Sequence, residues 1–320
     1  MSGVEVPGRF LPLPVHASEA ARAMLAAPST MAAATPYPAD DDKAGWRDHV
    51  EAVNAQLIGA MQPMMAGLPV EISDDRIGGV PVFRARPTGG ADEGRRVFLD
   101  MHGGALAYLG GTGCRMMAGF MALRVGMPVV SVDYRMPPDH PFPAGLDDCV
   151  AVYRALLTEY GADAIVIGGS SAGGNLAAAT ILKARDEGLS LPAGAVLLSP
   201  EVDLTEGGDS FSTNLGIDTV LSGSLMALNR LYAASVPLDD SYVSPLFGDF
   251  AQGFPRSFIQ SGTRDLFLSN AVNMHRALRR AGVEAHLHVF EAMPHGGFFG
   301  APEDEEVGVE IRRFLEECWS

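Results

Sequence analysis

Short apolar runs alternate with helical stretches along most of this chain, and this alternation limits the possible folds more than any other feature of its sequence. The runs expected to form strands are Val70–Ile72, Val80–Ala85, Val97–Met101, Val129–Val132, Ala164–Ile167, Ala195–Leu198, Ser257–Gln260 and Ala285–Phe290. Helices are expected at Trp46–Met65, Met116–Val125, Ala144–Tyr160, Asn175–Glu187, Asn270–Ala281 and Glu306–Cys318. Parallel strands need long crossover connections, which are usually helices. The alternation therefore predicts an α/β fold in which a mostly parallel, eight-stranded sheet is covered by helices on both faces.

One segment interrupts this alternation. From Asp203 to about Asp240 the sequence shows no clear strand, and Leu221–Ala234 has a helical pattern. The first 65 residues are also helical in pattern, with a stretch rich in Ala and Pro between two helices. We expect these two segments to form a cap across the ends of the strands, where functional residues of such sheets lie.

The composition excludes several classes of protein. The 320 residues include 39 acidic and 23 basic ones, for a net charge of −16, which disfavours binding to nucleic acid. No apolar run approaches the roughly 20 residues of a membrane span, and Met1–Leu13 lacks the pattern of a signal peptide. Three cysteines without metal-ligand spacing favour a reduced, cytoplasmic protein. The sequence contains no phosphate-binding loop and no metal-ligand cluster, so we expect neither a cofactor nor a metal.

The strongest local motif follows the expected strand at Ala164–Ile167. The segment from Gly168 to Asn175 reads GGSSAGGN, which places Gly169 and Gly173 two residues before and after Ser171. A nucleophile at a sharp turn from strand to helix has strained backbone and leaves no room for large flanking side chains. The helix N-terminus that follows favours developing negative charge. The pattern predicts that Ser171 is a nucleophile; a glycine-rich turn without chemistry is the alternative.

A serine nucleophile needs a base, and the base needs an orienting acid. In hydrolases with this motif the acid and then the histidine follow the serine. The candidate histidines are His275, His286, His288 and His295. We favour His295 because it follows the last expected strand in a glycine-containing loop, whereas His275 lies inside a helix and the other two share one face of a strand.

The acid is expected at Asp265, just beyond the strand Ser257–Gln260. Glu201 competes with it because it also follows a strand, and Asp203 lies close behind. The alternative for Glu201 is an ion pair or a hydrogen bond that supports the cap.

Acyl transfer passes through an oxyanion, which needs hydrogen-bond donors. The sequence His102-Gly103-Gly104-Ala105 stands at the end of the strand Val97–Met101. Its glycines leave backbone N–H groups free to point at a ligand. The predicted donors are the N–H groups of Gly103, Gly104 and Ala172, and we expect His102 to brace the loop through a hydrogen bond to the backbone.

At these residues the chain resembles the hormone-sensitive-lipase-like branch of the α/β-hydrolases, the bacterial esterases of family IV. The resemblance rests on the His-Gly-Gly loop, on the segment DYRMPPDHPFPA at 133–144 (similar to the family's D-Y-R-L-A-P-E-H-P-F-P-A), on the elbow at 169–175, on Asp265-Leu266 and on His295-Gly296. These motifs span residues 102–297. The resemblance implies that Ser171 is the nucleophile, His295 the general acid and base, and Asp265 its orienting acid. It also implies a catalytic domain of residues 46–204 and 241–320, and a helical cap of residues 1–45 and 205–240.

The chain departs from the family pattern at three positions. Ala105 replaces the third glycine of the oxyanion loop, and Ser170 stands where many members have Asp or Thr. Glu201 occupies a position that is often Trp, which makes the substrate side of the site more polar.

These features together predict a serine carboxylesterase that hydrolyses short- to medium-chain acyl esters through an acyl-enzyme intermediate. The expected partner is a small-molecule ester, and the resemblance implies a homodimer. A lactonase or an amidase would use the same residues. A ligand-binding receptor on this fold is the remaining alternative, but such receptors lose the histidine that is present here as His295.

Overall fold

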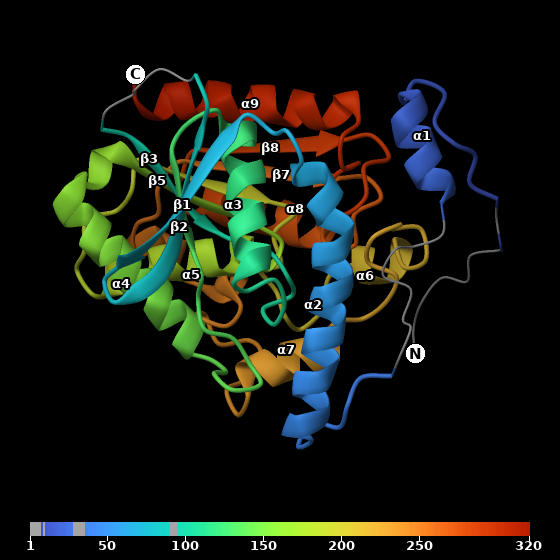
Figure 1. The fold of residues 1–320 in the computed structure, drawn as a ribbon, viewed down its shortest axis with the longest axis horizontal. Coiled ribbons are helices and arrows are strands. Elements are labelled where there is room, and N and C mark those ends of the chain that lie inside the picture. The colour runs from blue at the N-terminus through green and yellow to red at the C-terminus, as the bar shows by residue number, and fades with distance from the viewer. Residues whose placement is uncertain (1–7, 9, 28–35, 90–94) are drawn as a thin grey trace.

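The computed structural model describes residues 8, 10–27, 36–89 and 95–320. The predicted fold class is confirmed, because an eight-stranded, mostly parallel sheet lies at the centre of the molecule (Figure 1). The strands are β1 (Val70–Ile77), β2 (Val80–Pro87), β3 (Val97–Met101), β4 (Val129–Val132), β5 (Ile165–Ser170), β6 (Gly194–Leu198), β7 (Ser257–Gly262) and β8 (Ala285–Phe290). Their order is β1-β2-β4-β3-β5-β6-β7-β8. The β1–β2 and β2–β4 pairs are antiparallel, and the others are parallel.

Helices cover both faces of the sheet, because successive side chains of a strand point to opposite faces. The helices are α1 (Glu19–Ala26), α2 (Lys43–Met65), α3 (Thr112–Val125), α4 (Ala144–Glu159), α5 (Ala172–Asp186), α6 (Ser210–Thr213), α7 (Met226–Ala233), α8 (Leu268–Arg280) and α9 (Pro302–Cys318). In β3, Phe98 packs in a cluster with α3 and α9, whereas the next residue, Leu99, packs with α4, α5 and α8. Val166 and Ile167 of β5 divide in the same way. Both faces of the sheet are therefore buried in hydrophobic core.

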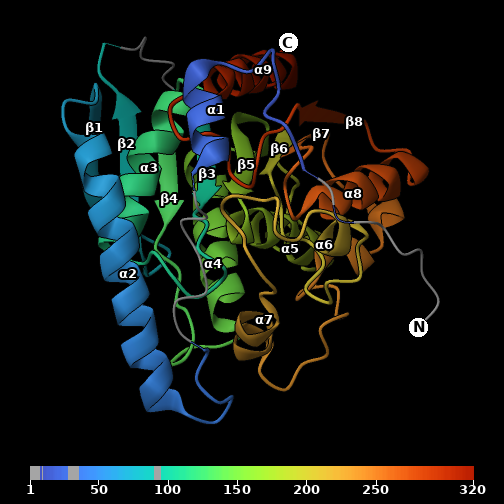
Figure 2. The ribbon, with the colours of Figure 1, turned by 90° about the vertical axis from the view of Figure 1, so that its right-hand side faces the viewer.

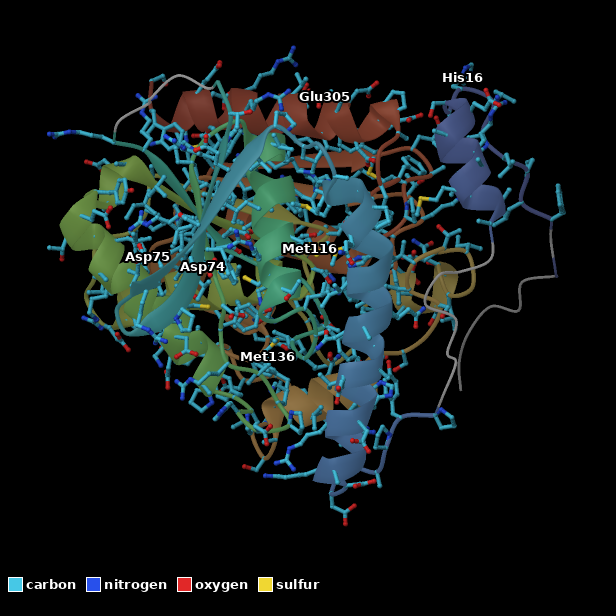
Figure 3. The ribbon with its side chains drawn as sticks, in the orientation of Figure 1. His16, Asp74, Asp75, Met116, Met136 and Glu305 are labelled. Atoms are coloured by element: carbon cyan, nitrogen blue, oxygen red, sulfur yellow. The ribbon has the colours of Figure 1, made fainter. Side chains whose placement is uncertain are left out.

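The hairpin of β1 and β2 extends further than the sequence pattern predicts. Gly78 and Gly79 both have positive φ (58° and 85°) and form the two-residue turn between Ile77 and Val80. β1 continues through polar residues that the apolar pattern does not mark, among them Asp74 and Asp75 (Figure 3). Asp75 pairs with Arg84 of β2 at 2.7 Å, and Asp74 pairs with Arg115 of α3. Charges on an edge strand disfavour pairing with another chain.

The segment between β6 and β7 is less helical than expected. Only Met226–Ala233 of the predicted helix Leu221–Ala234 is helical, and Ser210–Thr213 forms an additional short helix. Gly223 disfavours a helix, and the N–H of Leu221 donates to the Asp218 carboxylate instead of entering a helical ladder.

A third apolar cluster lies beyond the two sheet faces. It joins Trp46 of α2, Leu228 of α7, the loop residue Tyr108 and Phe267 beside β7. Figures 1 and 2 show α7 at the end of the molecule opposite α9. Residues 1–7, 9 and 28–35 of the predicted cap lie outside the described residues. In the part of the chain that the structure describes, no helix combines the length and the apolar character needed to cross a membrane.

Candidate active site

Ser171 lies at the sharp turn between β5 and α5, with φ 59° and ψ −123°. Its N–H donates to the carbonyl oxygen of Leu198 on β6 at 2.8 Å, which holds this unfavourable backbone in place. A Cβ atom on Gly173 would overlap the carbonyl oxygen of Met101 at the end of β3. The glycine therefore lets α5 begin directly against the sheet, and the turn presents the Ser171 side chain beyond the strand ends.

The structure brings His295, and none of the other candidate histidines, to Ser171. His295 Nε2 lies 2.9 Å from Ser171 Oγ, and the residue is 6% exposed. His286 instead pairs with Glu284 at 3.2 Å, and His288 stacks on Phe258 with ring centroids 4.5 Å apart. His275 lies within α8, as expected.

Asp265 is the acid that contacts the histidine. Its Oδ1 accepts a hydrogen bond from His295 Nδ1 at 3.1 Å and another from the N–H of Phe267 at 2.9 Å. Its Oδ2 accepts from Ser261 Oγ at 2.7 Å. A carboxylate can only accept, so Nδ1 carries the proton and Nε2 presents its lone pair to the Ser171 hydroxyl. The competitor Asp203 accepts instead from the N–H and hydroxyl of Thr205.

The electrostatics favour a negative acid and a more basic histidine. Burial raises the pKa of Asp265, but the charge and hydrogen bond of His295 outweigh burial, and the pKa of Asp265 lies below its usual value. Burial likewise lowers the pKa of His295, but the charge and hydrogen bond of Asp265 and the charge of Asp218 outweigh it, and the pKa of His295 lies above its usual value.

The predicted oxyanion loop lies against Ser171. A Cβ on Gly103 would stand 3.6 Å from the Cβ of Ser171. Gly104 has φ 122°, and its carbonyl oxygen accepts from the N–H groups of Ala107 and Tyr108, which closes the loop. The N–H groups of Gly103, Gly104 and Ala172 make no hydrogen bond to any other described residue. They are therefore free to donate to a bound group.

His102 braces this loop, as the sequence predicts. Its Nδ1 lies 2.7 Å from the carbonyl oxygen of Gly103, and its ring stacks on Tyr134 with centroids 4.2 Å apart. The Tyr134 hydroxyl donates to the carbonyl oxygen of His102 at 2.7 Å. The DYR segment at 133–135 thus supports the loop through its tyrosine.

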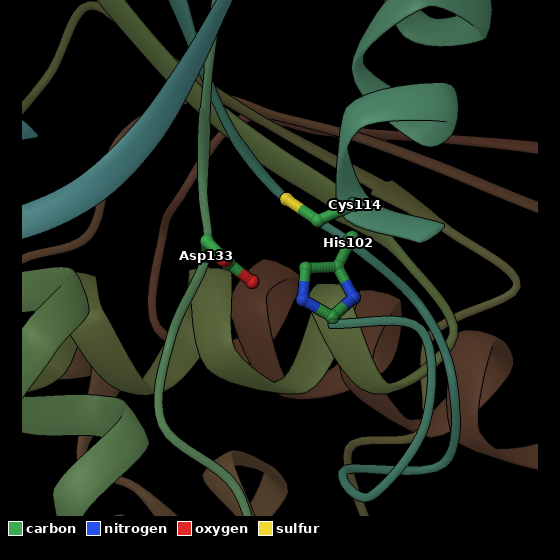
Figure 4. Close-up of side chains that lie close together, drawn as sticks. All are labelled: His102, Cys114 and Asp133. Carbon is green, nitrogen blue, oxygen red and sulfur yellow. The ribbon is translucent and has the colours of Figure 1, made fainter. Parts of the chain in front are cut away.

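His102, Cys114 and Asp133 also form a group whose side-chain ligand atoms lie within 4.8 Å of one another (Figure 4). Cys114 Sγ is near the Ser131 hydroxyl at 3.5 Å, and burial raises the pKa of its thiol well above the usual value. Asp133 accepts from the N–H of Gly111 at 2.8 Å. His102 and Asp133 each contact the backbone of this region, at Gly103 and Gly111, so we assign this group to the support of the loop.

Asp218 is a site residue that the sequence analysis missed. Its carboxylate is 2% exposed and accepts from the N–H groups of Leu266 and Val220, each at 2.8 Å. The N–H of His295 lies 3.3 Å from the same carboxylate. Burial raises the pKa of Asp218. Asp218 thus ties the segment between β6 and β7 to the loops that carry Asp265 and His295.

Asn214 adds to this connection from the same segment. Its side-chain amide donates to the carbonyl oxygen of Asp265 at 2.8 Å and to that of Thr263 at 3.2 Å. No sequence motif marks Asn214 or Asp218.

The chain is similar to known hydrolases in sequence and in fold. Residues 98–299 match the family model of the alpha/beta hydrolase fold. An esterase of Acinetobacter venetianus is 30% identical over 252 residues, which are 77% of this chain and 82% of that protein. An acetyl-hydrolase of Streptomyces hygroscopicus is 33% identical over 203 residues, which are 62% of this chain and 67% of that protein.

Solved structures are similar over nearly the whole chain. The crystal structure of one esterase has a TM-score of 0.88 and 34% identity, and the match covers 98% of both chains. The crystal structure of an esterase from the bacterial hormone-sensitive lipase family has a TM-score of 0.79 and 32% identity, with 90% of this chain and 94% of that chain covered.

Proposed function

This chain belongs to the α/β-hydrolase fold family and is a hydrolase, and we propose that it is a serine carboxylesterase that cleaves short- to medium-chain acyl esters through an acyl-enzyme on Ser171. The observation that carries the proposal is the chain of hydrogen bonds from Ser171 Oγ to His295 Nε2 and from His295 Nδ1 to Asp265.

In the first step Ser171 Oγ attacks the ester carbonyl while His295 Nε2 takes the hydroxyl proton. The N–H groups of Gly103, Gly104 and Ala172 hold the negative oxygen of the tetrahedral intermediate. Asp265 stabilises the histidinium that forms, because its carboxylate stays ionised beside Nδ1. As the intermediate collapses, the bond to the leaving oxygen breaks and His295 donates its proton to the alcohol.

In the second step water replaces the alcohol. His295 removes a proton from the water, which attacks the acyl carbonyl, and the same N–H groups hold the second oxyanion. Collapse breaks the bond to Ser171 Oγ, which regains its proton from His295 and releases the carboxylic acid.

We further propose that residues 1–45 and 205–240 act as a cap on a catalytic domain of residues 46–204 and 241–320. The support is the apolar cluster in which Leu221, Leu225 and Leu228 pack against Phe267, next to the Asp265 loop. A cytoplasmic location is supported by the three cysteines, which are all free. A homodimer rests on the family resemblance, and size-exclusion chromatography with light scattering tests it.

Hydrolysis of p-nitrophenyl acetate, butyrate, octanoate and palmitate by the wild type and by Ser171→Ala tests the proposal. We expect the wild type to prefer the shorter acyl chains and Ser171→Ala to lose a factor of about 10⁴ or more in kcat. Ser170→Ala is the matched control, because it removes a hydroxyl from the neighbouring residue. Turnover by Ser171→Ala at the wild-type rate contradicts the assignment. Lactones and amides measured beside the esters distinguish a lactonase or an amidase.

A further inference from the structure

Glu201 stands next to the nucleophile at the end of β6. Its N–H donates to the carbonyl oxygen of Ser171 at 3.2 Å. The side-chain amide of Asn175, on the first turn of α5, donates to the carbonyl oxygen of Glu201 at 2.9 Å and to that of Val243 at 2.8 Å. The backbone of Glu201 is therefore fixed relative to Ser171.

The carboxyl group of Glu201 is buried without a partner. The residue is 1% exposed, and neither Oε1 nor Oε2 has a hydrogen-bond partner among the described residues. A buried polar group without a hydrogen-bond partner destabilises the folded state. At a position fixed beside the nucleophile, a bound substrate can supply the missing partner.

The titratable groups that interact with this carboxyl belong to the triad and to the proposed cap. When this carboxyl is ionised, its charge raises the pKa of His295 and that of Tyr37 in the N-terminal segment. Glu206, in the segment after β6, is a like-charged neighbour that raises the pKa of Glu201. The side-chain amide of Asn229 in α7 donates to the carbonyl oxygen of Leu204 at 3.1 Å and also lies close enough to the carboxyl to lower the pKa of Glu201. The carboxyl thus lies within electrostatic reach of both His295 and the proposed cap.

Burial keeps this acid protonated at neutral pH, because it raises the pKa of Glu201 to about 8. A neutral carboxylic acid presents one donor and one acceptor. A hydroxyl group also presents both, and it can still donate when the carboxyl ionises. A negatively charged group is a poor partner, because Glu206 adds further negative charge nearby.

We propose that Glu201 determines substrate specificity by hydrogen-bonding a hydroxyl group that the ester carries in addition to its scissile bond. This inference rests on the proposed function and deepens it, because it assigns the natural substrate to the hydroxylated esters. Asp265 already orients His295, so Glu201 is free to contact substrate.

Two matched pairs of substrates test the inference. The first pair is ethyl 3-hydroxybutyrate and ethyl butyrate, which differ by a hydroxyl in the acyl part. The second pair is 2-hydroxyethyl butyrate and ethyl butyrate, which differ by a hydroxyl in the alcohol part. Hydrolysis is measured by pH-stat titration for the wild type, Glu201→Gln and Glu201→Leu. The readout is the ratio of the two kcat/KM values within each pair. Glutamine keeps a donor and an acceptor at nearly the same size, whereas leucine keeps neither.

We expect the wild type to prefer the hydroxylated ester at least tenfold in one of the pairs. Glu201→Gln retains most of this preference, and Glu201→Leu loses it. Equal ratios in the wild type and Glu201→Leu for both pairs overturn the inference. If Glu201→Leu does not fold, Glu201→Met, which is unbranched and also lacks hydrogen-bonding capacity, gives the same comparison. A wild type that hydrolyses none of the three esters contradicts the proposed function itself, whereas unchanged ratios with full turnover contradict only the role of Glu201.

Discussion

His295 Nδ1 donates to Asp265 Oδ1 at 3.1 Å, although a second buried acid, Glu201, also lies close enough to raise the pKa of the same histidine. The two carboxyl groups differ in what surrounds them. Asp265 accepts from Phe267 N–H and the Ser261 hydroxyl, which favour its charged form, whereas Glu201 accepts from no described residue. Hydrogen bonds to the charged form therefore separate the two acids, and only Asp265 is prepared to stay ionised beside a histidinium.

This difference predicts unequal effects of removing each charge. Asp265→Asn lowers kcat for p-nitrophenyl butyrate by a factor on the order of 10³–10⁴, because the amide no longer stabilises the histidinium and can select the wrong tautomer. Glu201→Gln leaves the His295–Asp265 bond in place and lowers kcat far less. Steady-state kinetics at pH 8 measure both. An equal loss in the two variants would assign the orienting role to Glu201.

The pH dependence of kcat/KM should report on His295. The base must be neutral to accept the Ser171 proton, and the pKa of His295 is raised, so the acid limb lies above pH 6.5. Asp218→Asn removes one of the charges that raise this pKa and moves the acid limb to lower pH. Asp249→Asn removes an exposed carboxylate that accepts from the Ala251 N–H and the Gln252 side chain, away from His295, and serves as the control. A limb at the same pH in all three proteins would show that Asp218 exerts no electrostatic effect on His295.

Two Tyr→Phe variants distinguish support of the oxyanion loop from a general contribution to stability. Tyr134→Phe removes the hydrogen bond to the His102 carbonyl, and Tyr153→Phe removes a similar one, from another buried tyrosine, to the carbonyl oxygen of Ser190. We expect each change to lower the free energy of unfolding by about 1 kcal/mol. Only Tyr134→Phe lowers kcat, because only that hydroxyl holds the loop with Gly103 and Gly104. Urea unfolding and esterase assays measure both effects in both variants. An equal loss of kcat in Tyr153→Phe would contradict a specific role of the Tyr134 hydroxyl in the oxyanion loop.

Glu201 should also make stability depend on pH. Its folded-state pKa of about 8 lies above the usual 4.5, so its contribution to stability is fully present below pH 4.5 and is lost as the pH rises through 8. Across this window the free energy of unfolding falls by up to about 1.4 kcal/mol per pH unit. Glu201→Gln removes the contribution of Glu201 to the pH dependence of the free energy of unfolding. The contribution of Asp100, whose pKa burial raises to about 7, stays in both proteins. Urea unfolding at pH 5.5 and 7.5 measures the slopes, and parallel lines for both proteins would contradict a buried, protonated Glu201.

The sheet and the triad geometry were open to prediction because their signals are local. Apolar runs mark strands that are buried on both faces, and a motif directly after such a run places its side chain at the same edge as the others. Ser171, Asp265 and His295 each follow β5, β7 or β8 in this way. The outer half of β1 was missed because it is polar on an edge, where burial imposes no apolar pattern.

The connections from the irregular segment could not be predicted in the same way. Asp218 meets Leu266 and His295 at separations of 48 and 77 residues, and no secondary structure fixes its position. An aspartate in a loop is usually solvated, so its burial is visible only in three dimensions. The predicted helix Leu221–Ala234 was wrong at its start for the same reason, since the N–H of Leu221 bonds to Asp218.

The central claim is that Ser171 carries the acyl group, and covalent labelling tests it most directly. The wild type, Ser170→Ala and Ser171→Ala are treated with an organophosphate ester, digested and mapped by mass spectrometry, while residual esterase activity is followed in parallel. We expect one adduct per chain on Ser171 in the wild type and in Ser170→Ala, formed in step with the loss of activity, and none in Ser171→Ala. Inactivation with the adduct on another residue, or labelling of Ser171→Ala at the wild-type rate, would contradict the claim.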